Sequence, residues 1–207
     1  MRKGIVFCWL FFLLLGVVSI FWRMELVYHL PTPVPKDYLA VSKGTYIDLS
    51  SVRSYLPAAA AVAGKQPLFL HFFNPDCPCS RFNIPHFKSL VREYGGRAQF
   101  AVVLVTAKEY TAGEVRKRFD LDPSISILKD TAIEKLCGVY STPQAVIIDT
   151  SDNLFYRGNY NRSRYCTDAK TSYAKTALEA IFNHDLNPVF SPLALRAYGC
   201  QLPTCNQ

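Results

Sequence analysis

The hydrophobic positions fall into one long uncharged run and several shorter groups with their own spacing. Residues 4–22 carry no charged side chain and directly follow Arg2 and Lys3. At about 1.5 Å per residue, a helix of this length just crosses a hydrocarbon layer about 30 Å thick. A cleaved signal peptide is the alternative, but this run is longer than the usual apolar region and lacks a small-residue cleavage site. The pattern therefore predicts a transmembrane signal anchor.

After this run, the hydrophobic groups alternate between strand-like and helix-like spacing. Short continuous apolar runs indicate buried strands, and apolar residues three or four positions apart indicate helices packed on one face. The predicted strands are 46–49, 67–73, 99–105, 144–149 and 154–157, and the predicted helices are 51–63, 79–94, 111–119 and 172–182. Between them lie a short apolar piece at 125–128 and a helical turn at 132–137. Strand–helix–strand units place parallel strands side by side, and the last two strands form a hairpin. We therefore expect a mixed sheet with helices on both faces.

The same pattern divides the chain into four parts. Residues 1–3 form a cytoplasmic N-terminus, because positive charges beside a span stay on the cytoplasmic side. Residues 4–22 are the anchor, and residues 23–44 form a proline-rich linker that acts as a stiff spacer. Residues 45–207 form one domain with a cysteine-containing C-terminal tail.

Composition adds limits on the class of protein. The chain has 207 residues, and its 50% hydrophobic and 14% aromatic content suits a packed core rather than a disordered chain. The formal net charge is +7. The local basic cluster of Arg157, Arg162 and Arg164 is typical of a solvated face, and no nucleic-acid-binding motif accompanies it. We therefore expect no nucleic-acid partner.

Cysteine usage agrees with an exported domain. Cys8 lies within the predicted span, and the remaining six cysteines follow it: Cys77, Cys79, Cys137, Cys166, Cys200 and Cys205. An even number in an oxidising compartment is compatible with disulfides. Cys200 and Cys205 close a short loop, which favours a structural disulfide, although either could reach back as a partner of the first cysteines. Cys137 and Cys166 fit either a disulfide or two independent thiols.

The candidate chemistry lies in the motif from Asp76 to Ser80, which reads Asp-Cys-Pro-Cys-Ser. It follows a predicted buried strand and opens a predicted helix. The free N–H groups and positive dipole end of a helix N-terminus lower the pKa of a thiol there. Arg81 adds positive charge in this setting, whereas Asp76 opposes it. These features favour a reactive thiolate at Cys77.

The motif resembles the thioredoxin superfamily when taken with Ser141-Thr142-Pro143, which precedes the third core strand. The resemblance covers roughly residues 45–185 and is strongest to membrane-anchored bacterial thioredoxin-like and peroxiredoxin-like proteins. In that superfamily, a cysteine motif opens the first core helix and a cis-proline lies beside it. The resemblance implies an α/β thioredoxin-like three-layer fold with a mixed central sheet, here preceded by one transmembrane helix. It also implies that Thr142 and Pro143 position the backbone of a bound extended peptide.

The resemblance implies a thiol–disulfide oxidoreductase, although the motif departs from the usual Cys-x-x-Cys. We expect Cys77 to attack and Cys79 to resolve; pairing of Cys77 elsewhere, with Cys79 as the free nucleophile, is the other option. The residues expected to tune the site are Pro75, Asp76, Pro78, Ser80 and Arg81. The expected partners are exported proteins with thiols or disulfides and a membrane redox partner, with no cofactor. In a bacterial host the domain would occupy the periplasm, tethered to the cytoplasmic membrane.

Three alternative functions stay open at this point. A Sco-like copper protein would use Cys77, Cys79 and His86, with His71 as a further candidate, because soft thiolates select Cu(I). The Sco family, however, spaces its cysteines as Cys-x-x-x-Cys and has a histidine before the late hairpin, and this sequence has neither. A peroxidase lacks support because Asn74 stands where that family has Thr or Ser. The last alternative is a non-catalytic interaction module.

Overall fold

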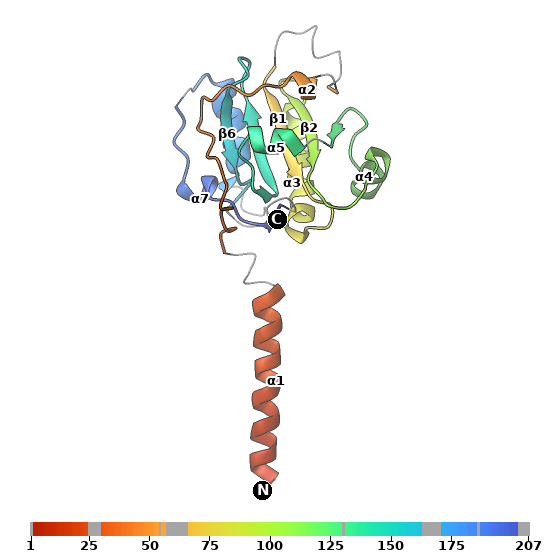
Figure 1. Cartoon of the computed structure of the whole chain (residues 1–207), viewed down its shortest axis with the longest axis vertical. Helices are drawn as coiled ribbons and strands as arrows, with labels where there is room; N and C mark the ends of the chain where they lie inside the picture. The colour runs from red at the N-terminus through yellow and green to blue at the C-terminus, as the bar shows by residue number, and fades with distance from the viewer. Residues whose placement is uncertain are drawn as a thin grey trace.

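The computed structural model describes residues 2–24, 30–53, 55–56, 66–129, 131–162, 171–185 and 187–202. Its first element is helix α1 (Arg2–Met24), in which every residue is exposed. This helix is long and apolar enough to cross a membrane, and its place near the N-terminus suits an anchor or a signal sequence. In Figure 1 it stands apart from the folded domain.

The domain is built on a five-stranded mixed sheet with strand order β3-β2-β1-β5-β6. The central strand β1 is parallel to β2 and antiparallel to β5. Strand β3 continues the parallel side, and β6 completes an antiparallel hairpin with β5. The bounds are β1 (Leu68–Phe73), β2 (Gln99–Leu104), β3 (Ser126–Leu128), β5 (Gln144–Ile148) and β6 (Leu154–Gly158). The predicted parallel neighbours and late hairpin are confirmed.

Helices cover both faces of this sheet, because each central strand is apolar on both sides. On one face, α3 (Pro78–Tyr94) and α6 (Tyr173–Phe182) pack against alternate residues of β1, including Phe69 and Phe73. On the other face, α2 (Ser50–Arg53) and α5 (Thr131–Leu136) pack against Leu70 and Phe72. Two further helices, α4 (Ala112–Phe119) and α7 (Pro192–Leu195), lie toward the edges of the domain in Figure 1. This three-layer arrangement is the predicted one.

Local signals set several boundaries. A capping box begins helix α4, with the Thr111 hydroxyl accepting from the Glu114 N–H and the Glu114 carboxylate accepting from the Thr111 N–H. Helix α3 continues through Pro85 to Tyr94. The predicted edge strand at 46–49 is wrong, because Tyr46 makes only an isolated bridge to Asn153. Of the predicted helix at 51–63, α2 ends at Arg53, Tyr55 and Leu56 lie in a turn and a bend, and residues 57–65 lie outside the described residues.

The C-terminal tail forms a second, small sheet beside the first. Strand β7 (Cys200–Gln201) pairs antiparallel with β4 (Ser141–Thr142). The sequence pattern predicted no strand here. The pairing matters because β4 directly precedes Pro143, so the tail lies next to the predicted peptide-positioning loop.

The predicted linker also contacts the domain from Pro31 onward. Pro31 bridges Tyr198 of the tail, and the Thr32 N–H donates to the Ala197 carbonyl at 2.9 Å. Further along, the Tyr38 hydroxyl donates to the Gly138 carbonyl at 2.9 Å. The folded unit therefore extends upstream of residue 45.

Candidate redox site

Cys77 is held at the start of α3 by a tight turn that follows β1. The Cys77 N–H donates to the Asn74 carbonyl at 3.1 Å, and the Asp76 N–H donates to Asn74 Oδ1 at 2.9 Å. Cys77 is the N-cap residue and Pro78 is the first helical residue. Proline suits this position because its missing N–H would have no partner within the helix. The local sequence therefore places the Cys77 sulfur at the helix N-terminus, as predicted.

Cys77 forms a disulfide with Cys200 of the tail. The S–S distance is 2.09 Å and the two Cα atoms are 6.1 Å apart, which is within the usual range for a disulfide. Cys200 is paired in register with Thr142, and Cys77 Sγ lies 3.6 Å from the Thr142 carbonyl oxygen. Three segments that are distant in sequence therefore meet at this bond: the start of α3, the loop before β5 and the tail.

This pairing corrects two predictions. Cys77 is not paired with Cys79, which is buried at 2% exposure and lies outside the disulfide. Residues two apart at a helix start point in different directions, which is why these neighbours do not face each other. The predicted Cys200–Cys205 disulfide is also wrong, because Cys200 is bonded to Cys77. Cys205 and Cys166 lie outside the described residues.

The predicted peptide-positioning loop adopts the expected backbone. The Thr142–Pro143 peptide bond is cis, and β5 begins at the next residue. Gly199 of the tail passes directly over this loop with φ +138°, a region that favours glycine. A Cβ atom at residue 199 would lie 2.1 Å from the Thr142 carbonyl oxygen. The close approach of tail and loop therefore depends on Gly199.

Tyr110 and Lys108 contact Asp76, the residue directly before Cys77. The Tyr110 hydroxyl donates to Asp76 at 2.8 Å, and Lys108 lies 3.3 Å from the same carboxylate. The hydrogen bond from Tyr110 is the main cause that lowers the pKa of Asp76, and the Lys108 charge adds to it. Asp76 is therefore ionised, and Lys108 offsets part of the negative charge that would disfavour a Cys77 thiolate.

The other residues predicted to tune the site have different surroundings. Ser80 is buried, and its hydroxyl accepts from the Asn74 N–H at 3.3 Å, so it supports the turn before Cys77. Arg81 is exposed, and its N–H donates to the Cys77 carbonyl at 3.2 Å. Pro75 is buried within the turn itself. A tuning role for these residues stays a prediction.

Arg157 differs from expectation, and Cys137 takes one of the two states left open for it. Arg157 is half-buried rather than part of a solvated face, and its guanidinium donates to the carbonyls of Val41 and Cys137 at 2.8 and 3.0 Å. Cys137 is a buried free thiol. Burial raises its pKa to about 12, so it stays protonated and unreactive at neutral pH.

The residues named for a copper site do not come together as one. Cys77 is in a disulfide, and His86 Nε2 lies 2.9 Å from the Ser172 hydroxyl. His71 is fully buried, and its Nδ1 lies 2.7 Å from the Tyr160 hydroxyl. Among the residues that the structure describes, no group of three or more His, Cys, Asp or Glu side chains is arranged to hold a metal ion. These positions do not fit a copper centre, and we derive no metal chemistry from them.

The buried His71 predicts a pH dependence of stability. Burial, with a smaller effect of His86, lowers the His71 pKa from 6.5 to about 3. Between these values the unfolded chain binds the proton and the folded chain does not, so stability falls as pH drops below about 6.5. We expect His71 to account for about 2 kcal/mol of stability loss between pH 7 and 5. Urea unfolding of the detergent-solubilised protein, followed by circular dichroism at both pH values, measures it.

The controls for this test use two histidine variants. In His71→Gln the stability loss between pH 7 and 5 should be smaller by that amount. In His184→Gln, which changes an exposed histidine, it should match the wild type. Equal losses in the wild type and His71→Gln would contradict the assignment to His71.

Comparison with known proteins places the chain in a family. Residues 49–204 match the model of a family described as "Domain of unknown function (DUF6436)". The chain belongs to the DUF6436 family. No curated protein sequence matches this DUF6436 protein.

Solved structures resemble the DUF6436 protein in fold. A hypothetical protein from Sinorhizobium meliloti 1021 is 17% identical with a TM-score of 0.60, covering 80% of this chain and 96% of its own. An uncharacterised conserved protein from Geobacillus kaustophilus is 16% identical with a TM-score of 0.59, covering 84% and 97%. A thiol:disulfide interchange protein of the thioredoxin family from Chlorobium tepidum TLS is 16% identical with a TM-score of 0.45, covering 73% and 97%.

The architecture itself identifies the fold of this DUF6436 member. A cysteine opens the first core helix, a cis-proline precedes β5, and both flank a mixed sheet covered by helices on each face. This combination is the one that the sequence resemblance implied. The chain has a thioredoxin-like fold.

Proposed function

We propose that this DUF6436 protein is a membrane-tethered thiol–disulfide oxidoreductase whose redox couple is Cys77 and Cys200. The observation that carries the proposal is the disulfide between them, at the helix N-terminus and beside the cis-proline. A helix N-terminus stabilises a thiolate, which is both the nucleophile and the leaving group in disulfide exchange. Cys77 occupies that position, and Cys200 is partly exposed on the tail.

The reaction proceeds through a mixed disulfide. In the reducing direction, the Cys77 thiolate attacks one sulfur of a client disulfide, and the other client sulfur leaves as a thiolate. The Cys200 thiolate then attacks Cys77 Sγ, which forms the Cys77–Cys200 bond and releases the second client thiolate. In the oxidising direction, a client dithiol takes up the disulfide by the reverse steps. A membrane dithiol or disulfide partner resets the couple.

The tail strand gives the second step a structural consequence. β7 covers the β4 edge beside Pro143, which is where the superfamily resemblance implies that a client backbone lies. Client and tail would therefore compete for one edge. Return of Cys200 to Cys77 would resolve the mixed disulfide and expel the client in one movement.

The proposed location follows from the first helix and the disulfide. α1 is long and apolar enough to cross a membrane. We propose that it anchors the chain in the cytoplasmic membrane, with the domain on the periplasmic side of a bacterial host. Disulfides persist in such an oxidising compartment. The proposed clients are exported proteins that carry thiols or disulfides.

A redox titration with mapped cysteines tests the proposal. Full-length protein in detergent micelles is equilibrated with reduced and oxidised glutathione, the thiols are alkylated, and disulfides are assigned by mass spectrometry. We expect a reversible two-electron couple between Cys77 and Cys200 in the wild type and in Cys79→Ser, because Cys79 lies outside the bond. Cys200→Ser should lose this couple.

Two outcomes would overturn the proposal at different levels. A couple that survives in Cys200→Ser but is lost in Cys79→Ser would restore the Cys77–Cys79 pair and the sequence prediction. A Cys77–Cys200 bond that never opens across the whole glutathione range would make the disulfide static. The protein would then be a non-catalytic interaction module.

A further inference from the structure

The tail is held mainly through its backbone, as a bound peptide would be. Its strand pairs with Ser141 and Thr142, and the Ser141 hydroxyl donates to the Cys200 carbonyl at 3.3 Å. From the other side, the Thr32 hydroxyl donates to the Gly199 carbonyl at 3.3 Å and lies 2.9 Å from the Ser141 hydroxyl. β4 and the segment around Thr32 thus form two walls of a groove. Contacts to backbone carbonyls accept many sequences.

Two positions in this groove are selective. At residue 199, any Cβ would lie 2.1 Å from the Thr142 carbonyl oxygen and 3.3 Å from Pro143 Cδ, so the residue before the bonded cysteine must be glycine. Two residues after the cysteine, Leu202 is only 1% exposed and belongs to the buried cluster beneath α5. That position therefore takes an apolar side chain. Gln201, which lies between Cys200 and Leu202, is partly exposed, so the side chain at this position is not restricted in the same way.

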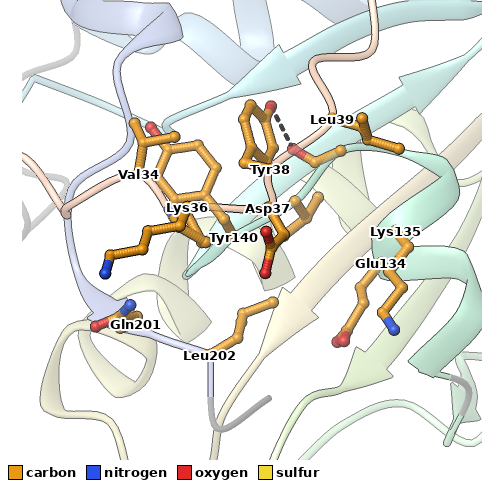
Figure 2. Close-up of a pocket in the computed structure, with 13 residues that line it drawn as sticks. Val34, Lys36, Asp37, Tyr38, Leu39, Glu134, Lys135, Tyr140, Gln201 and Leu202 are labelled. Atoms are coloured by element: carbon orange, nitrogen blue, oxygen red, sulfur yellow. Dashed lines mark hydrogen bonds between the residues drawn. The ribbon is translucent and has the colours of Figure 1, made fainter. Parts of the chain in front are cut away.

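The groove continues beyond the cysteine into a cavity of about 580 Å³. Figure 2 shows Gln201 and Leu202 beside this cavity, with Tyr38 and Tyr140 on one side and Glu134 on the other. The rings of Tyr38 and Tyr140 pack edge to face with centroids 4.9 Å apart. An extended chain that follows the path of the tail therefore has an aromatic wall and open volume next to it.

We propose that this groove is a binding site for extended segments of the pattern Gly-Cys-x-apolar, and that the C-terminal tail is its built-in occupant. The inference rests on the proposed function, which supplies the exchange at Cys77. A client thiolate of this pattern attacks Cys77 Sγ, the Cys77–Cys200 bond breaks, and the electron pair leaves on the Cys200 thiolate. The client strand then pairs with β4 in place of β7, and the freed tail leaves the groove.

Peptide exchange on the full-length protein tests the sequence preference. Cys200→Ser protein in detergent micelles is first loaded with glutathione on Cys77. Three capped peptides with identical thiol content are then added at equal concentration: AYGCQL, which copies residues 197–202, AYACQL and AYGCQS. Each peptide thiol that attacks Cys77 releases one glutathione, and mass spectrometry measures the Cys77–peptide disulfide at equilibrium.

We expect AYGCQL to be captured at least tenfold more than AYACQL, because the added methyl group meets the Thr142 carbonyl. Capture of AYGCQS should be lower than that of AYGCQL, because serine cannot replace Leu202 in the buried cluster. Equal capture of all three peptides, with glutathione exchange intact, would overturn this inference and leave the oxidoreductase standing. Failure of Cys77 to exchange with any thiol, glutathione included, would overturn both.

Discussion

Replacing Gly199 by alanine should shift the Cys77–Cys200 equilibrium toward the dithiol by about five- to a hundredfold. The new Cβ would lie 2.1 Å from the Thr142 carbonyl oxygen, and φ of +138° is strained for any residue with a side chain. Backbone strain of this kind costs about 1–3 kcal/mol, and each 1.4 kcal/mol is about tenfold in an equilibrium constant. The disulfide needs the strand pairing that this strain opposes. Titration against glutathione, read by mass spectrometry, gives the constant directly.

Gly96→Ala is the matched control for this variant. A Cβ atom added at Gly96 would meet no heavy atom within 4 Å, and this residue lies in the turn after α3, so its substitution should leave the glutathione equilibrium unchanged. An unchanged equilibrium in Gly199→Ala would show that the tail reaches Cys77 without pairing to β4. The β7 contacts would then be incidental to the bond.

Reduction of the Cys77–Cys200 bond should lower the free energy of unfolding by about 4 kcal/mol. The bond joins residues 123 positions apart, so it removes many conformations from the unfolded chain. The chain-entropy model gives about 4–5 kcal/mol for loops of this size. Urea unfolding of the full-length protein in micelles, followed by circular dichroism with and without reductant, measures the difference.

Cys200→Ser is the internal control for the stability effect. Reductant should lower the unfolding midpoint of the wild type more than that of Cys200→Ser, because this variant has no Cys77–Cys200 bond to reduce. Reduced wild type and Cys200→Ser should then unfold at similar urea concentrations. If reductant leaves the wild-type urea midpoint unchanged, the Cys77–Cys200 crosslink adds nothing to stability.

Most of the core strands and helices could be predicted from the sequence, because each is indicated by the residues of a short segment. Strands buried on both faces appear as continuous apolar runs, which is why β1, β2 and β5 lie within a residue or two of their predicted bounds. Thr111 followed three residues later by Glu114 is enough to predict the start of a helix. The cis bond before Pro143 follows from the resemblance to the superfamily motif. Each of these predictions needs only a short stretch of chain.

The cysteine pairing could not be read in this way. Cys79 and Cys205 are the nearest sequence neighbours of Cys77 and Cys200, yet the bond joins Cys77 to Cys200, because helix direction and strand register decide which sulfurs meet. β7 has two residues, too few to show a strand period. The contacts of Thr32 and Ser141 with the tail could not be predicted either, because they form only when the tail lies between these two residues. Glycine directly before Cys200 was the one available signal.

The bridge between Pro31 and Tyr198 sets how far the protein can reach. Residues 25–30 separate the end of α1 from this bridge, and a fully extended chain covers about 3.5 Å per residue. With α1 in a bilayer, as proposed, Cys200 lies within about 40 Å of the end of the anchor, however the intervening residues are arranged. Such a short connection would restrict disulfide exchange at Cys77 and Cys200 to the space close to the membrane surface. Chains emerging from export or embedded nearby would meet it, whereas proteins diffusing deeper in the compartment would have to come to the membrane.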